Sequence, residues 1–421
     1  MLFKWVPWKL FIKYLALSKG FIDPVLLLSK FNQFAQPSEV WAPIELLRAG
    51  AVLHARGLIN SQVIQHNLDW VWPYWAERQF DPLDNSFIPR AFSMTQINLT
   101  HRNWTATGIP GYQEFVVVDP SGLVMPFFDS FSIDFWVILA DGRVLVPSRL
   151  KNPRQRLDYN GALKIITEHN YCGIDLSSTV QPILRNGIPA CRIDVRATVP
   201  VKGWLVVSLR PYNMEGISFI HRIELFNSLK AWRVEKSRMV FFERAPQYYR
   251  FSNYKSGDVF HKVQSDCRPT QKSINCTIGM ATAMIGYQAL PSEVCEATLY
   301  IPFEKSRKYQ QVFSSDKTAA VIWEEARSGS SKFHIPYSNF EFLYNAALQT
   351  VLLHTPRESY AGPYTYKRFW FRDAAFIVNA LLCAGLEDRA ERIINTFFQH
   401  QQPSGYFLSQ DGEWDSNGQA L

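Results

Sequence analysis

The sequence of 421 residues lacks the features that identify membrane-spanning, nucleotide-binding or metalloprotease chains. Lysines interrupt its apolar N-terminal segment, residues 1–35, so no apolar run there reaches the ~18 residues that a transmembrane helix requires. The same segment does not follow the plan of a secretory signal peptide. No P-loop, G-x-G-x-x-G, H-E-x-x-H or G-x-S-x-G motif occurs, so nucleotide binding, zinc-dependent proteolysis and serine esterase chemistry have no support.

Paired cysteines and long basic runs are also missing. The six cysteines include no C-x-x-C pair and none lies at metal-ligand spacing from a histidine, so we expect reduced thiols, a cytoplasmic location, no metal and no cofactor. A formal charge of +7 comes from 44 basic and 37 acidic residues without a basic cluster, which argues against a nucleic-acid partner. Hydrophobic residues make up 47% of the chain, which is typical of a folded protein of two or three domains.

Residues 1–108 are predicted to form a helical, aromatic-rich N-terminal arm. Apolar residues recur at helical spacing from position 40 to 79, and aromatic side chains gather in Trp70–Trp75. Residues 1–20 resemble a basic amphipathic helix, which fits either contact with a membrane surface or docking on the protein itself. We expect docking, and keep membrane contact as the alternative.

Residues 109–304 are predicted to form an antiparallel β-sandwich. Apolar and polar residues alternate here, and turn dipeptides such as Asp141-Gly142 separate the alternating stretches. The predicted strands are Phe115–Val118, Trp136–Leu139, Val144–Val146, Cys191–Val199, Trp204–Leu209, Ile217–Leu225, Met239–Glu243 and Ala297–Phe303. Two packed sheets accommodate this number of strands better than one sheet does. We give Arg210, at the end of one strand, a structural role at a domain interface.

Helical spacing returns in the last part of the chain. Residues 305–332 are predicted to contain a linker helix, and residues 333–421 to form the first hairpins of a helical domain. The predicted helices are Thr318–Arg327, one that begins near Ser338 or Asn339 and runs to Leu352, Asp373–Ala384 ended by Gly385, and Ala390–Phe398 ended by Pro403. The last two are expected to pack as a helical hairpin.

An Arg-Asp pair, Arg372 and Asp373, opens one of these helices within the segment Phe369–Ala375. A guanidinium beside a carboxylate offers donors and acceptors together, which suits the adjacent hydroxyl groups of a sugar ring. Trp370 could stack on the ring or form a wall of the pocket. In the alternative interpretation, Asp373 only caps its helix and Arg372 forms a salt bridge with Asp373.

A polar loop with an aromatic centre, residues 405–419, lies between two predicted helices. We interpret it as an active-site loop in which Glu413, Trp414 and Asp415 contact a sugar. A second interpretation, compatible with the first, is a turn in which Asp415 or Ser416 caps the following helix.

These motifs and their order resemble the six-hairpin (α/α)6 glycosidase superfamily. Its members include glucoamylases, glycogen-debranching amylo-α-1,6-glucosidases, trehalases and disaccharide phosphorylases, many with a β-sandwich before the barrel. The resemblance covers about residues 109–421 and rests on His334–Tyr337 at the barrel entrance and on the Arg-Asp motif. It implies that Arg372 and Asp373 hold the terminal glucose of the substrate.

The resemblance implies a glycoside hydrolase-type protein that acts on α-linked glucosides, oligo- or polysaccharide, by inversion. Glycoside cleavage needs two carboxyl groups across the scissile bond. Their identity is open, and Glu413 is a weak candidate for the acid. Alternatives are a disaccharide phosphorylase of the same superfamily and a non-catalytic carbohydrate-binding or membrane-peripheral protein.

Only 91 residues run from Ser331 to Leu421, enough for about five helices at most, whereas the barrel has about twelve. We therefore expect an incomplete barrel, exposed apolar helix faces and little or no hydrolytic activity from this chain alone. An incomplete sequence, a split protein whose second chain completes the barrel, and a degenerate protein each fit this expectation. The first is preferred.

Overall fold

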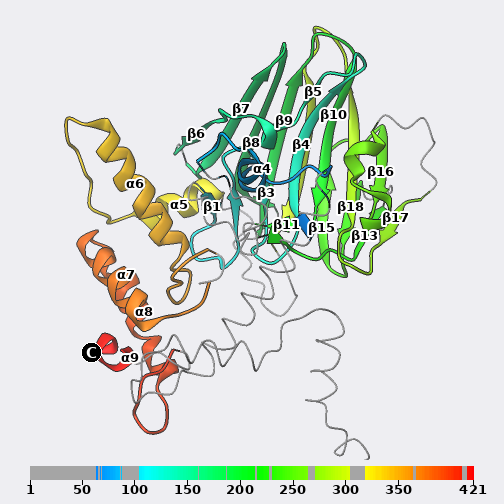
Figure 1. The fold of residues 1–421 in the computed structure, drawn as a ribbon. Coiled ribbons are helices and arrows are strands. Elements are labelled where there is room, and N and C mark those ends of the chain that lie inside the picture. The colour runs from blue at the N-terminus through cyan, green and yellow to red at the C-terminus, as the bar shows by residue number, and fades with distance from the viewer. Residues whose placement is uncertain are drawn as a thin grey trace, which may run out of the picture.

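The computed structural model describes residues 63–64, 67, 69–85, 87, 104–159, 161–185, 187–213, 216–226, 230–263, 271–303, 318–363, 367–409 and 415–421. Two antiparallel sheets form the larger part, and a group of helices follows them in the chain (Figure 1). Most of the predicted N-terminal arm, including residues 1–20, lies outside the described residues. No helix within the described ranges is long and apolar enough to cross a membrane.

The first sheet has eight strands. Its order is β1 (Thr105–Gly108), β2 (Phe115–Val118), β3 (Val124–Met125), β4 (Ser132–Leu139), β10 (Gly203–Arg210), β18 (Thr282–Ala289) and β16 (Tyr248–Ser252), with β5 (Val144–Leu145) paired to β4. The β4–β5 pair is the hairpin predicted from Asp141-Gly142, where Gly142 adopts a φ of 89°. A separate short hairpin joins β11 (Tyr212–Asn213) to β12 (Gly216–Ile217).

The second sheet has nine strands. Its order is β17 (Ser273–Asn275), β13 (Arg222–Phe226), β14 (Ala231–Val234), β15 (Arg238–Phe242), β19 (Cys295–Pro302), β9 (Ile188–Thr198), β8 (Ile174–Arg185), β7 (Lys164–Tyr171) and β6 (Arg154–Asp158). One predicted strand, Ile217–Leu225, is wrong. Phe219 adopts a φ of 53°, outside the extended region, and the segment divides into β12 and β13.

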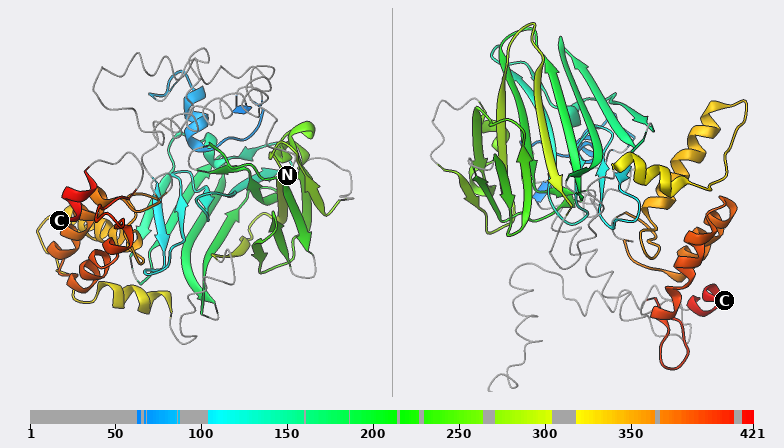
Figure 2. Two further views of the ribbon diagram at one scale, coloured as in Figure 1. Left: turned by 90° about the horizontal axis from the view of Figure 1, so that it is seen from below. Right: turned by 180° about the vertical axis from the view of Figure 1, so that it is seen from behind.

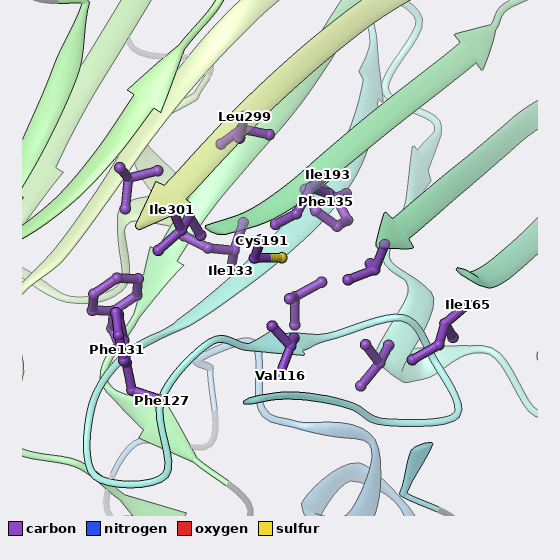
Figure 3. Close-up of a cluster of buried hydrophobic side chains, with 14 of the residues drawn as sticks. Val116, Phe127, Phe131, Ile133, Phe135, Ile165, Cys191, Ile193, Leu299 and Ile301 are labelled. Carbon is purple, nitrogen blue, oxygen red and sulfur yellow. The ribbon is translucent and has the colours of Figure 1, made fainter. Parts of the chain in front are cut away.

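The two sheets pack face to face around one apolar core, as predicted. Ile133 and Phe135 of β4 lie in the same buried cluster as Ile193 of β9 and Leu299 of β19 (Figure 3). Side chains alternate between the two faces of a strand, so every second residue of β9 and β19 enters this core. The intervening residues of these two strands form the outer face of the nine-stranded sheet.

The outer face of the eight-stranded sheet is covered by an N-terminal segment that ends in helix α4 (Tyr74–Phe80). Val71 of this segment packs with Trp136, Val206 and Met284 in a second buried cluster. All eight residues of β4 are buried for this reason, because one face meets the core and the other meets the segment.

Arg210 ties this segment to the sheets. Its guanidinium is completely buried and pairs with Asp258, with Nη1 to Oδ1 at 2.5 Å. Its Nη2 also donates to the carbonyl of Val71 at 2.9 Å, while the Val71 N–H donates to Asp258 Oδ2 at 2.8 Å. The interface role predicted for Arg210 agrees with these contacts.

The helical group begins after the sandwich. It comprises α5 (Ala319–Arg327), α6 (Ser338–Leu353), α7 (Phe371–Cys383), α8 (Glu387–Ile394), the 3-10 turn η7 (Phe397–His400) and α9 (Ser416–Ala420).

Gly385 ends the α7 region with a φ of 74°, as predicted. The helix predicted over Ala390–Phe398 is wrong in its bounds, because α8 ends at Ile394. The N-cap predicted at Ser338 or Asn339 is wrong, because both residues lie within helix α6 and the N-cap residue is Tyr337. The incomplete barrel remains a prediction.

Buried polar contacts connect the helices to the sandwich. The indole N–H of Trp323 in α5 donates to the Gly108 carbonyl at 2.9 Å, and Trp323 is completely buried. Lys367, which precedes α7, pairs with Glu114 of the sandwich at 2.9 Å, with both side chains largely buried. Charged pairs removed from water in this way hold a fixed geometry, so they position the start of α7 relative to the sheets.

Large apolar side chains are exposed on the helical group, as predicted. They are Val321, Phe333, Tyr337, Phe340, Phe342, Leu343, Phe376, Leu382, Ile394, Phe398 and Leu421. Helix α6 carries Phe340, Phe342 and Leu343, and α7 carries Phe376 and Leu382. In the view from behind, much of both helices projects beyond the sandwich (Figure 2).

Candidate functional site

The start of α7 has two faces of different character. Phe369 and Phe371 point into an aromatic cluster, and Phe371 is completely buried, with its ring centroid 5.1 Å from that of Phe397. The residues between and after them, Trp370 and Arg372, lie on the outer side. The alternation arises because Trp370, the residue before the helix, is still extended, with φ −142° and ψ 129°. The buried phenylalanines therefore fix the direction of the outer pair.

Arg372 lies between two carboxylates. Its Nε is 4.0 Å from Asp373 Oδ2, and its Nη1 is 3.8 Å from Asp415 Oδ2. Both separations exceed the 2.7–3.2 Å of a hydrogen bond, so the charges attract one another while donors and acceptors remain open to a ligand. About half of the Arg372 side chain is exposed, at 52%.

Asp415 reaches this position through packing in the loop before it. The Phe407 ring lies 5.6 Å from the Phe371 ring, and the Phe407 N–H donates to Asn417 Oδ1 at 2.9 Å. Asn417 belongs to α9, so this hydrogen bond connects Phe407 to the helix. Asp415 is the capping residue of α9, yet its side chain makes no capping hydrogen bond. The structure thus confirms Asp415 at the N-cap position, and its carboxylate is available to Arg372 because it makes no capping hydrogen bond.

Trp370 forms the aromatic border of the site. The guanidinium carbon of Arg372 lies 6.0 Å from the Trp370 ring centroid, and that of Arg368 lies 4.8 Å away. Cations at these distances are attracted to the face of an indole ring. The arrangement leaves an aromatic surface next to the two carboxylates and Arg372, which is the combination that sugar rings bind.

A second polar group borders the same aromatic cluster, and sequence reasoning missed it. The His400 ring stacks on Phe369 with a centroid distance of 4.1 Å and an interplanar angle of 8°. His400 Nε2 lies 3.4 Å from Glu358 Oε2. The two residues are 42 positions apart and belong to no local motif, so no signal in the sequence predicts the pair.

Four of the predicted site residues are brought together by the structure: Trp370, Arg372, Asp373 and Asp415. The other two, Glu413 and Trp414, lie outside the described residues. Within the residues that the structure covers, no group of three or more His, Cys, Asp or Glu side chains could hold a metal ion.

Comparison with known proteins identifies the fold. No protein-family model and no curated protein sequence matches the chain. Among solved structures, bacterial glucoamylase complexed with acarbose matches with a TM-score of 0.52 and 10% identity, over 73% of this chain and 52% of that one. A putative kojibiose phosphorylase from human microbiome matches with a TM-score of 0.42 and 8% identity, over 70% of this chain and 47% of that one.

The chain thus spans about half the length of the structures it matches. The two antiparallel sheets followed by helices are an arrangement that it shares with the glucoamylase. The resemblance inferred from the Arg-Asp motif and the order of parts is confirmed at the level of the fold: this protein has the fold of part of a bacterial glucoamylase.

Proposed function

We propose that the protein acts on α-linked glucosides and that Arg372, Asp373 and Asp415 hold one glucose unit. The position of Arg372 between two carboxylates carries this proposal, because both gaps are too long for direct hydrogen bonds. A hydroxyl group that lies beside such a pair can accept from the guanidinium and donate to the carboxylate. Two neighbouring hydroxyls of a glucose ring could satisfy both gaps at once.

Aromatic side chains complete the proposed subsite. Trp370 offers a flat apolar surface to the C–H groups of the sugar ring, and we assign the same role to Trp414 from its place in the loop before Asp415. The fold shared with a glucoamylase that binds acarbose supports a carbohydrate ligand for this chain.

For the reaction we propose hydrolysis with inversion, as the resemblance to glucoamylases implies. Inversion requires an acid and a base about 6.5–9.5 Å apart, on opposite sides of the sugar ring. Glu413 is our candidate for the acid because it lies two residues before Asp415 in the sequence. Because we expect little or no activity from this chain alone, proton NMR of maltotriose is recorded at high protein concentration, before mutarotation mixes the anomers: β-glucose as the first product supports inversion, and α-glucose contradicts it.

Replacing Arg372 with alanine is expected to weaken binding of maltotriose by about 10- to 100-fold. The reason is that hydrogen bonds to a charged group contribute about 1.5–3 kcal/mol each. Isothermal titration calorimetry of the wild type and the Arg372→Ala variant measures the change. Arg372→Lys should recover only part of the affinity, since a lysine keeps the charge and loses the planar fork of donors.

Arg222 supplies a matched control for this experiment. It is 51% exposed and pairs with Glu224, a carboxylate two residues along its own strand in the sandwich. Arg222→Ala should leave the affinity for maltotriose unchanged. Equal affinities for the wild type and Arg372→Ala would remove Arg372 from the proposed subsite.

A further inference from the structure

The outer face of the nine-stranded sheet carries a trough that runs along β8. From Asp175 to Gln181 the outward side chains of β8 are polar; Ser177 and Thr179 are the shortest of them, and both are half-buried. The flanking strands β7 and β9 present longer side chains at the same level, because Ser177 pairs with Glu168 on one side and with Arg196 on the other. The short side chains of β8 therefore form the polar floor of a channel, and the longer side chains of β7 and β9 form its two sides.

Ion pairs form the walls of this trough. Arg156 and Glu168 approach to 3.6 Å on the β6–β7 side, and Arg196 and Glu296 to 2.9 Å on the β9–β19 side. Two hollows of about 890 and 490 Å³ lie along the face and share lining residues of both walls. Cavities of this size bind small molecules and short polymers in other proteins. The view from behind shows this sheet, with β19 among its strands (Figure 2).

We propose that this trough binds a neutral saccharide chain, at a site separate from that of Arg372. The choice of an α-linked glucan as one probe rests on the proposed function, whereas the trough itself is argued from the sheet alone. From Asp175 to Gln181, the outward side chains of β8 span roughly 20 Å at 3.3 Å per residue. That length suits several linked sugar units in extended form.

The balance of charge in the trough favours a neutral ligand. The lining contains four guanidinium groups and five carboxylates: Arg154, Arg156, Arg192, Arg196, Glu168, Asp175, Asp194, Glu243 and Glu296. A polyanion such as a nucleic acid needs an excess of cations, and the mixed lining does not provide one. A sugar chain carries donors and acceptors on every unit, so it can bond to both kinds of group.

The polar groups of the trough are already held in place by their neighbours. Asp194 accepts hydrogen bonds from Arg192 and Thr298, both at 2.8 Å. Asp175 accepts from Asn170 at 2.5 Å and from Thr198 at 3.2 Å. Groups that are ordered before binding lose less conformational entropy when a ligand arrives. The trough is therefore suited to a ligand that makes many weak polar contacts.

Filling the trough tests the proposal. Titration calorimetry with maltoheptaose and with cellohexaose, two neutral glucans of different linkage, is compared for the wild type and for Ser177→Trp, whose indole would occupy the floor. We expect the affinity for at least one glucan to fall by about tenfold or more. Ser273→Trp is the matched control, because Ser273 is also half-buried and lies on β17 at the other edge of the same sheet.

A second variant keeps the test independent of folding. Arg196→Ala with Glu296→Ala removes one wall at positions that are 67% and 55% exposed, so the sheet itself is not disturbed. The affinity of this double variant for the same glucan should fall as that of Ser177→Trp does. The Arg372→Ala variant distinguishes the two sites. It should weaken the binding of maltotriose and leave the affinity of the trough for the longer glucans unchanged.

Two kinds of outcome overturn the trough proposal, and a third contradicts only the proposed function. Equal affinity of the trough variants and the wild type for both glucans, or no binding of either glucan at millimolar concentration, means that the trough is not a saccharide site. Binding of heparin without binding of either glucan would assign the trough to anionic chains. If Arg372→Ala binds maltotriose as tightly as the wild type does while the trough variants lose affinity, the proposed function is contradicted and the trough proposal stands.

Discussion

Replacing Asp258 with alanine is expected to lower the free energy of unfolding by about 3–5 kcal/mol. The carboxylate of Asp258 is the charge partner of Arg210, and both side chains are completely buried. Removing it leaves a guanidinium without its counter-charge inside the protein. It also removes the acceptor of the Val71 N–H, which has a hydrogen bond of 2.8 Å to Asp258 Oδ2. Urea unfolding followed by tryptophan fluorescence measures the loss.

Asp141 offers a control for this experiment. It pairs with Arg143 at 2.6 Å, and both side chains are more than a third exposed to solvent. Asp141→Ala should therefore change the free energy of unfolding very little, because a surface pair contributes little to stability. A loss for Asp258→Ala no larger than that for Asp141→Ala would show that the buried pair does not hold the N-terminal segment to the sheets. Arg210→Met combined with Asp258→Leu should recover part of the stability, since it buries no charge.

Replacing Asp119 with asparagine is expected to stabilise the protein above pH 7 and to have no effect near pH 3. Burial raises the pKa of Asp119 from 3.8 to about 7, against the opposing hydrogen bonds from Ser121 and Leu123. The pKa is higher in the folded state, so this carboxyl favours folding fully below pH 3.8, and the contribution is lost as the pH rises to about 7. A shift of roughly three pKa units corresponds to about 4 kcal/mol as an upper bound.

The geometry around Asp119 is compatible with an amide. Oδ1 of Asp119 accepts from the Ser121 N–H at 2.8 Å and from the Leu123 N–H at 2.9 Å, and an asparagine oxygen can do the same. Thermal unfolding of both proteins between pH 4 and 9 tests the prediction. The two curves should coincide in acid and separate as the pH rises. Burial also raises the pKa of Asp134, to about 6, but Asp134 is present in both proteins. Parallel curves would contradict the prediction.

Local sequence signals predicted much of the sandwich and the helices. Asp141-Gly142 predicts a hairpin because glycine adopts the positive φ that the turn requires, and Gly385 ends a helix for the same reason. The long hairpin of β7 and β8 was not predicted. Its turn places Cys172 at a φ of 51° before Gly173 at 79°, and a cysteine in that position gives little indication of a turn.

The candidate site was predictable to the extent that it is local. Arg372 and Asp373 adjoin in the chain, so the helix start alone brings them together. The approach of Asp415 follows from the packing of Phe407 on Phe371, which depends on tertiary structure. The trough could not be predicted at all, because its walls arise from strand register. Arg196 and Glu296 are far apart in the chain and meet only because β9 pairs with β19.

The bond between Val71 and Asp258 also sets an order of events during synthesis. The two residues are 187 positions apart, so Asp258 leaves the ribosome roughly 10–40 s after Val71 at 5–20 residues per second. During that interval the apolar side chains of the segment before α4 have no finished sheet to cover. A nascent chain stalled before position 258 should therefore bind chaperones through this early segment, and release from them should coincide with the emergence of β18.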